Sequence, residues 1–192
     1  MLQIMNNERV LVRDTLLKKS VAWPDTNRYF YAGILGYCDL INTPPEKLKV
    51  MFVDFQLSNI RLFLEQDWLI YPVCHRVILV SDRYLLPLAN YYCGRFNQID
   101  SVIQASGGSE DIFNQINYVI SGKKVSPPSK ASLSTREMCL LRILTSGVSV
   151  RELADRLQLS PKTVYAIRQN MLAKMGLRKM KDIFLQAVPS AR

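Results

Sequence analysis

LQLSPKTVYAIRQNMLAKM, residues 157–175, is the stretch of sequence that is most informative about the fold around it. Ser160 followed by Pro161 is typical of a helix start, because serine caps free backbone N–H groups and proline fits the first helical turn. The stretch contains no acidic residue, and its bases are interleaved with Tyr165, Gln169 and Asn170. A helix face that is merely solvated usually carries both signs of charge, so this face needs another explanation.

The two sides of this predicted helix differ in character. Apolar residues recur every three or four positions and predict a stripe that faces the interior: Val164, Ile167, Met171 and Met175. The other side is polar or small: Lys162, Tyr165, Ala166, Gln169 and Ala173. Small residues let a helix sit deep in a DNA groove. Gln169 can bind an adenine edge, Ala166 can meet a thymine methyl group, and Lys162 can reach guanine or phosphate.

The residues around this helix predict an all-α domain over residues 133–192. Ser134 with Glu137, and Ser149 with Glu152, each have capping-box spacing and predict helix starts near 135 and 150. A fourth helix is predicted over 179–187, after Gly176. The helices from 150 and from 161 are joined by only a few residues, which favours a helix-turn-helix whose second helix enters the major groove.

The charge of the chain is unevenly distributed. Residues 1–125 hold 13 Lys or Arg and 12 Asp or Glu, whereas residues 126–192 hold 12 and 4, so almost all of the net charge of +9 lies in the last third. This asymmetry favours a polyanion partner, with nucleic acid preferred over a membrane surface. The alternative is a basic face that only keeps the domain soluble. The acid-free helix favours double-stranded DNA, with Arg168 and Lys174 suited to phosphates.

The region before the helical domain predicts a parallel α/β fold. A linker is expected at 122–132, where Pro127 and Pro128 suit neither helix nor strand. Before it, residues 1–121 alternate between short apolar runs and helical patterns, which is typical of a parallel sheet with helices on both faces. The expected strands are 16–23, 48–55, 75–82 and 99–106, and the expected helices are 27–42, 58–67, 84–97 and 109–121.

Several classes of function are disfavoured. The sequence has no apolar run long enough to cross a bilayer, and its N-terminus is too charged for a secretory signal, so we expect a cytoplasmic protein. The four cysteines form no C-x-x-C pair and are expected to be buried thiols. Cys74 beside His75 is a weak signal, since strand neighbours point to opposite faces. We expect no metal, no cofactor and no enzymatic activity.

Residues 133–177, LSTREMCLLRILTSGVSVRELADRLQLSPKTVYAIRQNMLAKMGL, resemble the LuxR/FixJ (NarL-type) DNA-binding domain. The resemblance rests on L-S-T-R-E, the Gly147 turn, E-L-A, L-x-L-S-x-x-T-V and the final K-M-G-L. It implies base contacts by Tyr165, Ala166 and Gln169, and phosphate contacts by Lys162, Thr163, Arg168 and Lys174. It also implies a dimer contact through the fourth helix at Met180, Ile183 and Phe184, although the residues alone fit a core role equally well. The family usually has histidine where this chain has Ile167.

The N-terminal region resembles a response-regulator receiver that lacks part of its phosphorylation machinery. Asp54 stands where the phosphoacceptor is expected and Ser81 where the switch hydroxyl is expected. The acid pair that holds Mg²⁺ is replaced by Trp23-Pro24 and a single Asp25, and Gln104 stands in place of the lysine. Because phosphoryl transfer depends on those charges, we expect little or no phosphorylation of Asp54, which remains as a vestigial phosphoacceptor.

The chain as a whole is similar to enterobacterial regulators of fimbrial or pilus operons. That resemblance predicts a dimeric, sequence-specific transcription regulator, associated with the bacterial nucleoid, whose first domain serves protein contacts. The alternative is a partner or antagonist that heterodimerises with a related regulator and binds DNA weakly by itself. Two features favour that alternative: Ile167 and the incomplete receiver set.

Overall fold

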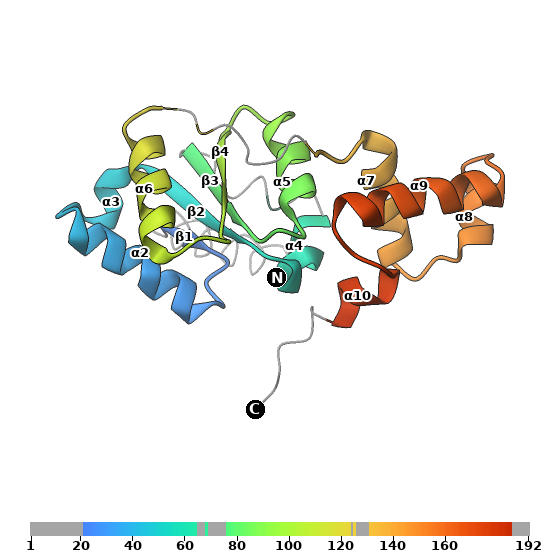
Figure 1. The fold of residues 1–192 in the computed structure, drawn as a ribbon, viewed down its shortest axis with the longest axis horizontal. Helices are drawn as coiled ribbons and strands as arrows, with labels where there is room; N and C mark the ends of the chain where they lie inside the picture. Colours follow the sequence, from blue (N-terminus) through green and yellow to red (C-terminus); the bar gives the residue numbers. More distant parts are fainter. Residues whose placement is uncertain (1–20, 65–67, 69–75, 124, 126–130, 186–192) are drawn as a thin grey trace, which may run out of the picture.

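The chain forms an α/β domain followed by a helical domain (Figure 1). The computed structural model describes residues 21–64, 68, 76–123, 125 and 131–185. Cys74, His75 and the first residues of the predicted strand 16–23 lie outside the described residues. Among the described helices, none combines the length and apolar character needed to cross a bilayer.

The core of the first domain is a parallel sheet. Its strands stand in chain order, and all four were predicted: β1 (Ala22–Trp23), β2 (Val50–Phe55), β3 (Arg76–Ser81) and β4 (Ile99–Gln104). All three pairings are parallel, with Asp54 opposite Val80 and Ser81 opposite Gln104. Doubly wound receiver-like folds usually order five strands as 2-1-3-4-5. In the described part of the chain β1 is instead an edge strand.

Helices cover both faces of this sheet, as the alternation along the sequence predicted. One face packs against α2 (Arg28–Leu40) and α6 (Ser109–Ile120), and the other against α4 (Ile60–Leu64) and α5 (Leu86–Cys93). Successive side chains of β2 point to opposite faces of the sheet. Phe52 lies in the core beneath α2 and α6, whereas Val53 lies in the core beneath α4 and α5. Two short turns of helix, α3 (Pro45–Leu48) and η1 (Leu57–Asn59), flank β2.

The second domain contains the four predicted helices: α7 (Thr135–Thr145), α8 (Val150–Arg156), α9 (Pro161–Lys174) and α10 (Met180–Leu185). Ser134 and Glu137 form the predicted reciprocal capping box. The box predicted at Ser149 is only half formed: its hydroxyl accepts from the Glu152 N–H, but the Glu152 carboxylate pairs with Arg156 at 2.6 Å instead.

The two domains share a packed junction that the sequence did not predict. Leu133 and Met138 belong to the same buried cluster as Leu86 of α5. The Leu133 N–H donates to the Pro87 carbonyl at 3.0 Å, and the Asn90 amide donates to the Ala131 carbonyl at 2.8 Å. Further donors cross the junction, from Arg95 to the Thr135 hydroxyl and from Arg142 to the Leu64 carbonyl.

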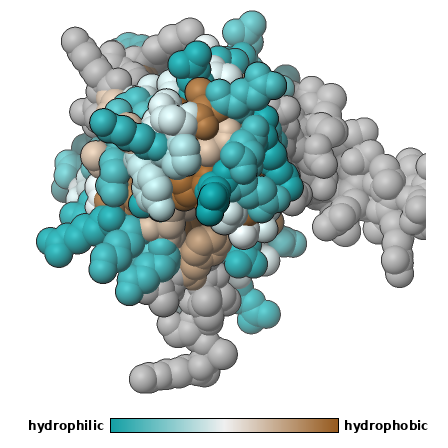
Figure 2. Space-filling view, turned by 90° about the vertical axis from the view of Figure 1, so that its right-hand side faces the viewer, coloured by the Kyte–Doolittle hydropathy of each residue, from teal (hydrophilic) through white to brown (hydrophobic). Residues whose placement is uncertain are grey.

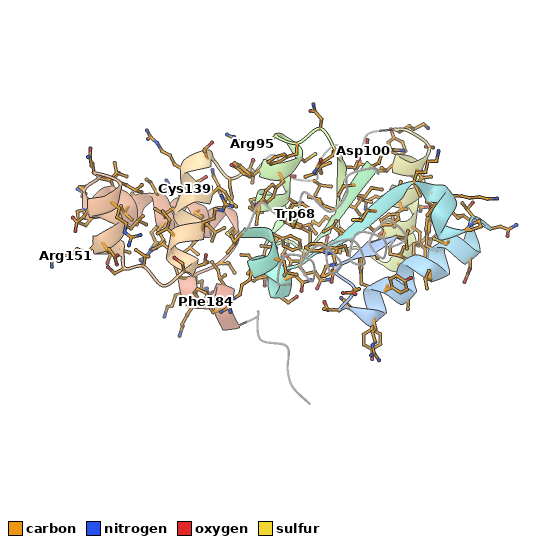
Figure 3. All side chains as sticks on the ribbon, turned by 180° about the vertical axis from the view of Figure 1, so that it is seen from behind. Trp68, Arg95, Asp100, Cys139, Arg151 and Phe184 are labelled. Carbon is orange, nitrogen blue, oxygen red and sulfur yellow. The ribbon has the colours of Figure 1, made fainter. Side chains whose placement is uncertain are left out.

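The fourth helix of the second domain also lies at this junction. Ile183 is completely buried, and Met180 packs against two hydrophobic clusters. Phe184 lies on the underside of the junction in Figure 3, with the Arg61 guanidinium 6.0 Å from its ring centroid. In this arrangement the three residues act as core and junction residues.

The expectation that the cysteines are buried has a mixed outcome. Cys38 is buried as expected and Cys93 is half-buried, but Cys139 is exposed on α7, so the expectation of a buried thiol is wrong there (Figure 3). Tyr92 is completely buried, and its hydroxyl donates to the Phe63 carbonyl. Tyr91 and Tyr92 of α5 are therefore core residues.

Candidate nucleic-acid interface

The orientation of α9 is fixed by its cap and by its buried stripe. The Ser160 hydroxyl accepts from the Thr163 N–H at 3.1 Å, and Pro161 occupies the first turn, as predicted. Val164 and Met171 are completely buried. Ile167 packs against the cluster that also holds Leu153 of α8. One side of α9 is thereby held against α8, and the other side faces outward.

The outward side carries the residues that the sequence associated with DNA. Lys162, Thr163, Tyr165, Ala166 and Gln169 are all at least partly exposed. Tyr165 retains 48% of its surface in contact with solvent although it is a large hydrophobic side chain. The end of the molecule that carries α8 and α9 is predominantly hydrophilic (Figure 2). Nothing in the described part of the chain covers this face.

Arg168 and Tyr165 form a pair within this surface. The Arg168 guanidinium lies 4.6 Å from the centroid of the Tyr165 ring, within the range of a cation–π contact. The Arg168 Nε is buried and has no hydrogen-bond partner among the described residues. The contact favours the rotamers in which Tyr165 and Arg168 lie against each other on this surface.

Lys174 has partners inside the domain. Its ammonium donates to the Glu137 carboxylate at 2.7 Å and to the Ser132 carbonyl at 3.0 Å. Burial of Glu137 by itself raises the pKa of that carboxyl, but the hydrogen bonds from Lys174 and Ser134 outweigh burial and hold the pKa below its usual value. An ammonium group has three donors, so one N–H of Lys174 is left for a phosphate.

One basic residue of this surface was not predicted from the sequence. Arg151 is exposed in the first turn of α8 and projects outward at the tip of the domain in Figure 3. Arg156, by contrast, is paired with Glu152. The only sequence signal for Arg151 was the excess of positive charge, which does not tell one arginine of the domain from another.

The other predicted site residue, Asp54, lies at the carboxyl edge of the sheet. Asp54 at the end of β2 is only 1% exposed. Its Oδ2 accepts from the Asn27 amide at 2.8 Å and from the Asn59 amide at 3.2 Å, whereas Oδ1 has no partner among the described residues. Burial raises the pKa of Asp54, and the nearby charge of Asp82 raises it further, while the amide hydrogen bonds oppose that rise.

The carboxylate of the neighbouring acid, Asp82, also accepts hydrogen bonds from the chain itself. One Asp82 oxygen accepts from the Leu57 N–H at 2.6 Å, and the other accepts from the N–H groups of Tyr84 and Leu85. Asp82 therefore acts as a local backbone cap. Buried Ser81 donates to the Asp82 carbonyl at 2.9 Å.

These residues do not fit a magnesium site. Mg²⁺ is usually held by carboxylates that keep several waters in its shell. Here one oxygen of Asp54 accepts from two side-chain amides, both oxygens of Asp82 accept from backbone N–H groups, and Asp25 is exposed. Trp23, which replaces an acid of the receiver pattern, stacks on Trp68 with ring centroids 6.0 Å apart. No group of three or more metal-binding side chains occurs in the described part of the chain.

Two family models match the chain. Residues 2–120 match the EcpR N-terminal domain, and residues 131–187 match the family described as bacterial regulatory proteins, luxR family. Among curated proteins, YqeH of Escherichia coli (strain K12) is 29% identical over 167 residues, which is 86% of this chain and 79% of that protein.

Solved structures that match the chain include two of RcsB. One, described as two RcsB dimers bound to two parallel DNAs, is 19% identical with a TM-score of 0.48 and covers 88% of this chain and 96% of its own. The other is RcsB from Salmonella enterica serovar Typhimurium bound to the promoter P1flhDC. It is 18% identical with a TM-score of 0.45, and the match covers 86% of this chain and 94% of the RcsB chain.

Proposed function

This chain belongs to the family of the EcpR N-terminal domain and is a luxR-family DNA-binding regulator with a receiver-like first domain, and from this premise we propose that it acts as a homodimer that binds specific duplex sequences and regulates transcription. The observation that carries the proposal is the outward side of α9. This side is free of acids, rigidly oriented by its buried stripe, and uncovered by the described residues.

We assign the contacts according to side-chain chemistry. Tyr165, Ala166 and Gln169 lie in the middle of the exposed side, where a helix in the major groove meets base edges. Four residues are assigned to phosphates: Lys162, Thr163, Arg168 and Lys174. The placement of Lys162 and Thr163 in the first turn of α9 supports this assignment, because helix N-termini favour anions.

The receiver-like domain serves protein contacts in this proposal, and Asp54 is not a phosphoacceptor. Support comes from the protein donors that occupy one oxygen of Asp54 and both oxygens of Asp82, and from Trp23-Pro24 in place of the acids that would hold the cation that phosphoryl transfer requires. We further propose that the target genes are those of fimbriae or pili, on the basis of the resemblance to regulators of such operons.

The proposal is tested by selecting genomic DNA fragments with the purified full-length protein at physiological salt, followed by sequencing. We expect enrichment of paired half-sites separated by one helical turn or a multiple of it. The matched control is the Lys162→Ala, Arg168→Ala double variant, which should enrich nothing. Weak binding without sequence preference by the unmodified protein would favour the heterodimerising partner instead. Enriched sites that lie outside fimbrial and pilus operons would overturn only the choice of target genes.

A further inference from the structure

The outer side of α2, at the end of the molecule opposite α8 and α9, has an unusual composition (Figure 1). Tyr29 and Leu40 are 93% and 70% exposed. Between them Gly33 and Gly36 are both exposed, and this outer side carries charge only near its two ends. An ordinary solvated helix of this length would carry several charged residues along that side.

Among the described residues, no packing contact requires a glycine at position 33 or 36. Each is helical, and a Cβ added at either position would meet nothing within 4 Å. Glycine inside a helix costs roughly 0.5–1 kcal/mol relative to alanine, so the pair costs about 1–2 kcal/mol without an internal packing reason. Glycine is the residue that lets another backbone approach closely.

We propose that this side of α2 packs in an antiparallel manner against the same side of α2 in a second copy of the chain. The spacing is self-complementary. Tyr29 lies as far before the midpoint between residues 34 and 35 as Leu40 lies after it, and the same holds for Gly33 and Gly36. A two-fold axis through that midpoint places Tyr29 of each copy against Leu40 of the other, with the glycines at the crossing. Such an interface uses one patch twice, as two-fold dimers do.

The charges at the two ends of α2 support a second copy as the occupant. Arg28 begins the helix and Asp39 lies in its last turn. Both oppose the helix dipole, which favours acids at the N-terminus and bases at the C-terminus. In the antiparallel pair Arg28 of one copy lies about 3 Å along the axis from Asp39 of the other, two residues at 1.5 Å each, so the two unfavourable charges neutralise each other across the interface.

This inference deepens the proposed homodimer by naming its surface, and it rests on the proposed function only in that respect. The alternative surface, on α10, is occupied within the chain because Ile183 is buried and Phe184 lies at the domain junction. Pairing through α2 leaves α9 uncovered, since the two helices lie at opposite ends of the molecule (Figure 1).

The first test measures the dimer dissociation constant of the full chain by sedimentation equilibrium without DNA. Gly33→Gln combined with Gly36→Gln should weaken association at least tenfold by blocking the close approach. The variant should fold at least as stably as the unmodified chain, because glutamine is the better helix former. The matched control is Asn114→Gln, at an exposed position of α6, which should leave association unchanged. A monomeric unmodified chain, or an unchanged constant in the glycine variant, would overturn the proposal.

The second test exchanges the charges. Arg28→Glu alone and Asp39→Arg alone should each weaken the dimer, and the double variant should restore it. A double variant weaker than both single variants would contradict the antiparallel pairing. Duplex binding is measured in parallel on the same samples. A chain that dimerises through α2 but binds no duplex contradicts the proposed DNA function alone, whereas a monomeric chain that binds duplex contradicts this inference alone.

Discussion

The outward side of α9 and the carboxyl edge of the sheet both carry polar side chains that the sequence associated with phosphate chemistry, but they present them differently. Lys162 and Gln169 are open to solvent, whereas Asp54 is 1% exposed and held by Asn27 and Asn59. Residue type is therefore not sufficient to define a site. A polar group can act on a ligand only when the fold leaves it accessible and keeps at least one of its donors or acceptors free.

The largest effect should come from removing two bases of α9 together. Lys162→Ala with Arg168→Ala should weaken binding to every duplex by about 3 kcal/mol, at roughly 1.5 kcal/mol for each charge-assisted hydrogen bond. The slope of log affinity against log salt should become shallower by about 1.8, because each phosphate that the variant no longer neutralises accounts for about 0.9. Both quantities come from fluorescence anisotropy titrations at several salt concentrations.

The control for that variant removes the same charge from outside the second domain. Lys47→Ala with Lys123→Ala changes two exposed lysines outside the proposed interface. It should leave the salt slope unchanged. If both double variants lowered the slope equally, the binding would depend on net charge rather than on α9.

The next effect concerns base recognition. Gln169→Ala should cost about 1–3 kcal/mol at the preferred site and relax the preference at one base position, because an amide side chain can both donate to and accept from the edge of adenine. Asn170→Ala is the matched control, since Asn170 is adjacent, exposed and outside the assigned set. An unchanged preference profile for Gln169→Ala, measured by sequencing selected random duplexes, would remove Gln169 from the base contacts.

Local patterns predicted most of the fold. The four apolar runs correspond to the four strands, and Ser134 and Ser160 cap the helices that they were expected to cap. The apolar stripe of α9 identified its buried side correctly. These features depend on residues that are close together in the sequence, which is why periodicity and capping rules detect them.

Long-range contacts were not predictable in the same way. The Arg142 side chain binds a carbonyl 78 positions away, and Lys174 binds Glu137 from 37 positions away. Neither contact leaves a periodic trace in the sequence. The half-formed capping box at Ser149 has a related cause, because Glu152 had a competing partner in Arg156 that the capping pattern ignores.

Lys174 has a feature in common with each of these regions. It is a basic residue of α9, and like Asp54 it already has a hydrogen-bond partner within the chain. Lys174→Met should lower the free energy of unfolding by about 1–2 kcal/mol, since it leaves the Glu137 carboxylate buried without its ammonium. This cost is smaller than for a fully buried pair, because the Lys174 side chain is 36% exposed. Arg168→Ala should change stability much less. Chemical denaturation measures both variants.

The pH dependence of the same pair has a definite sign. The pKa of Glu137 in the folded protein lies below its usual value, so its ionised form stabilises the fold above the usual carboxyl pKa. That stabilisation should be lost as the pH falls through the usual value towards the lowered one. In Glu137→Gln this part of the acid destabilisation should disappear. An identical pH profile for the variant would show that the pair contributes nothing.

The smallest effect should follow Asp54→Asn, the substitution that in an active phosphoacceptor would abolish signalling. If Asp54 is a buried internal residue, duplex affinity should stay within about twofold, equivalent to less than about 0.5 kcal/mol. The raised pKa of Asp54 means that its ionised form opposes folding, so the variant should be at least as stable at neutral pH. The stability difference should shrink as the pH falls and Asp54 itself becomes protonated. Denaturation and anisotropy on the same preparation separate the two roles, because loss of duplex binding with intact stability would restore Asp54 as a regulatory residue.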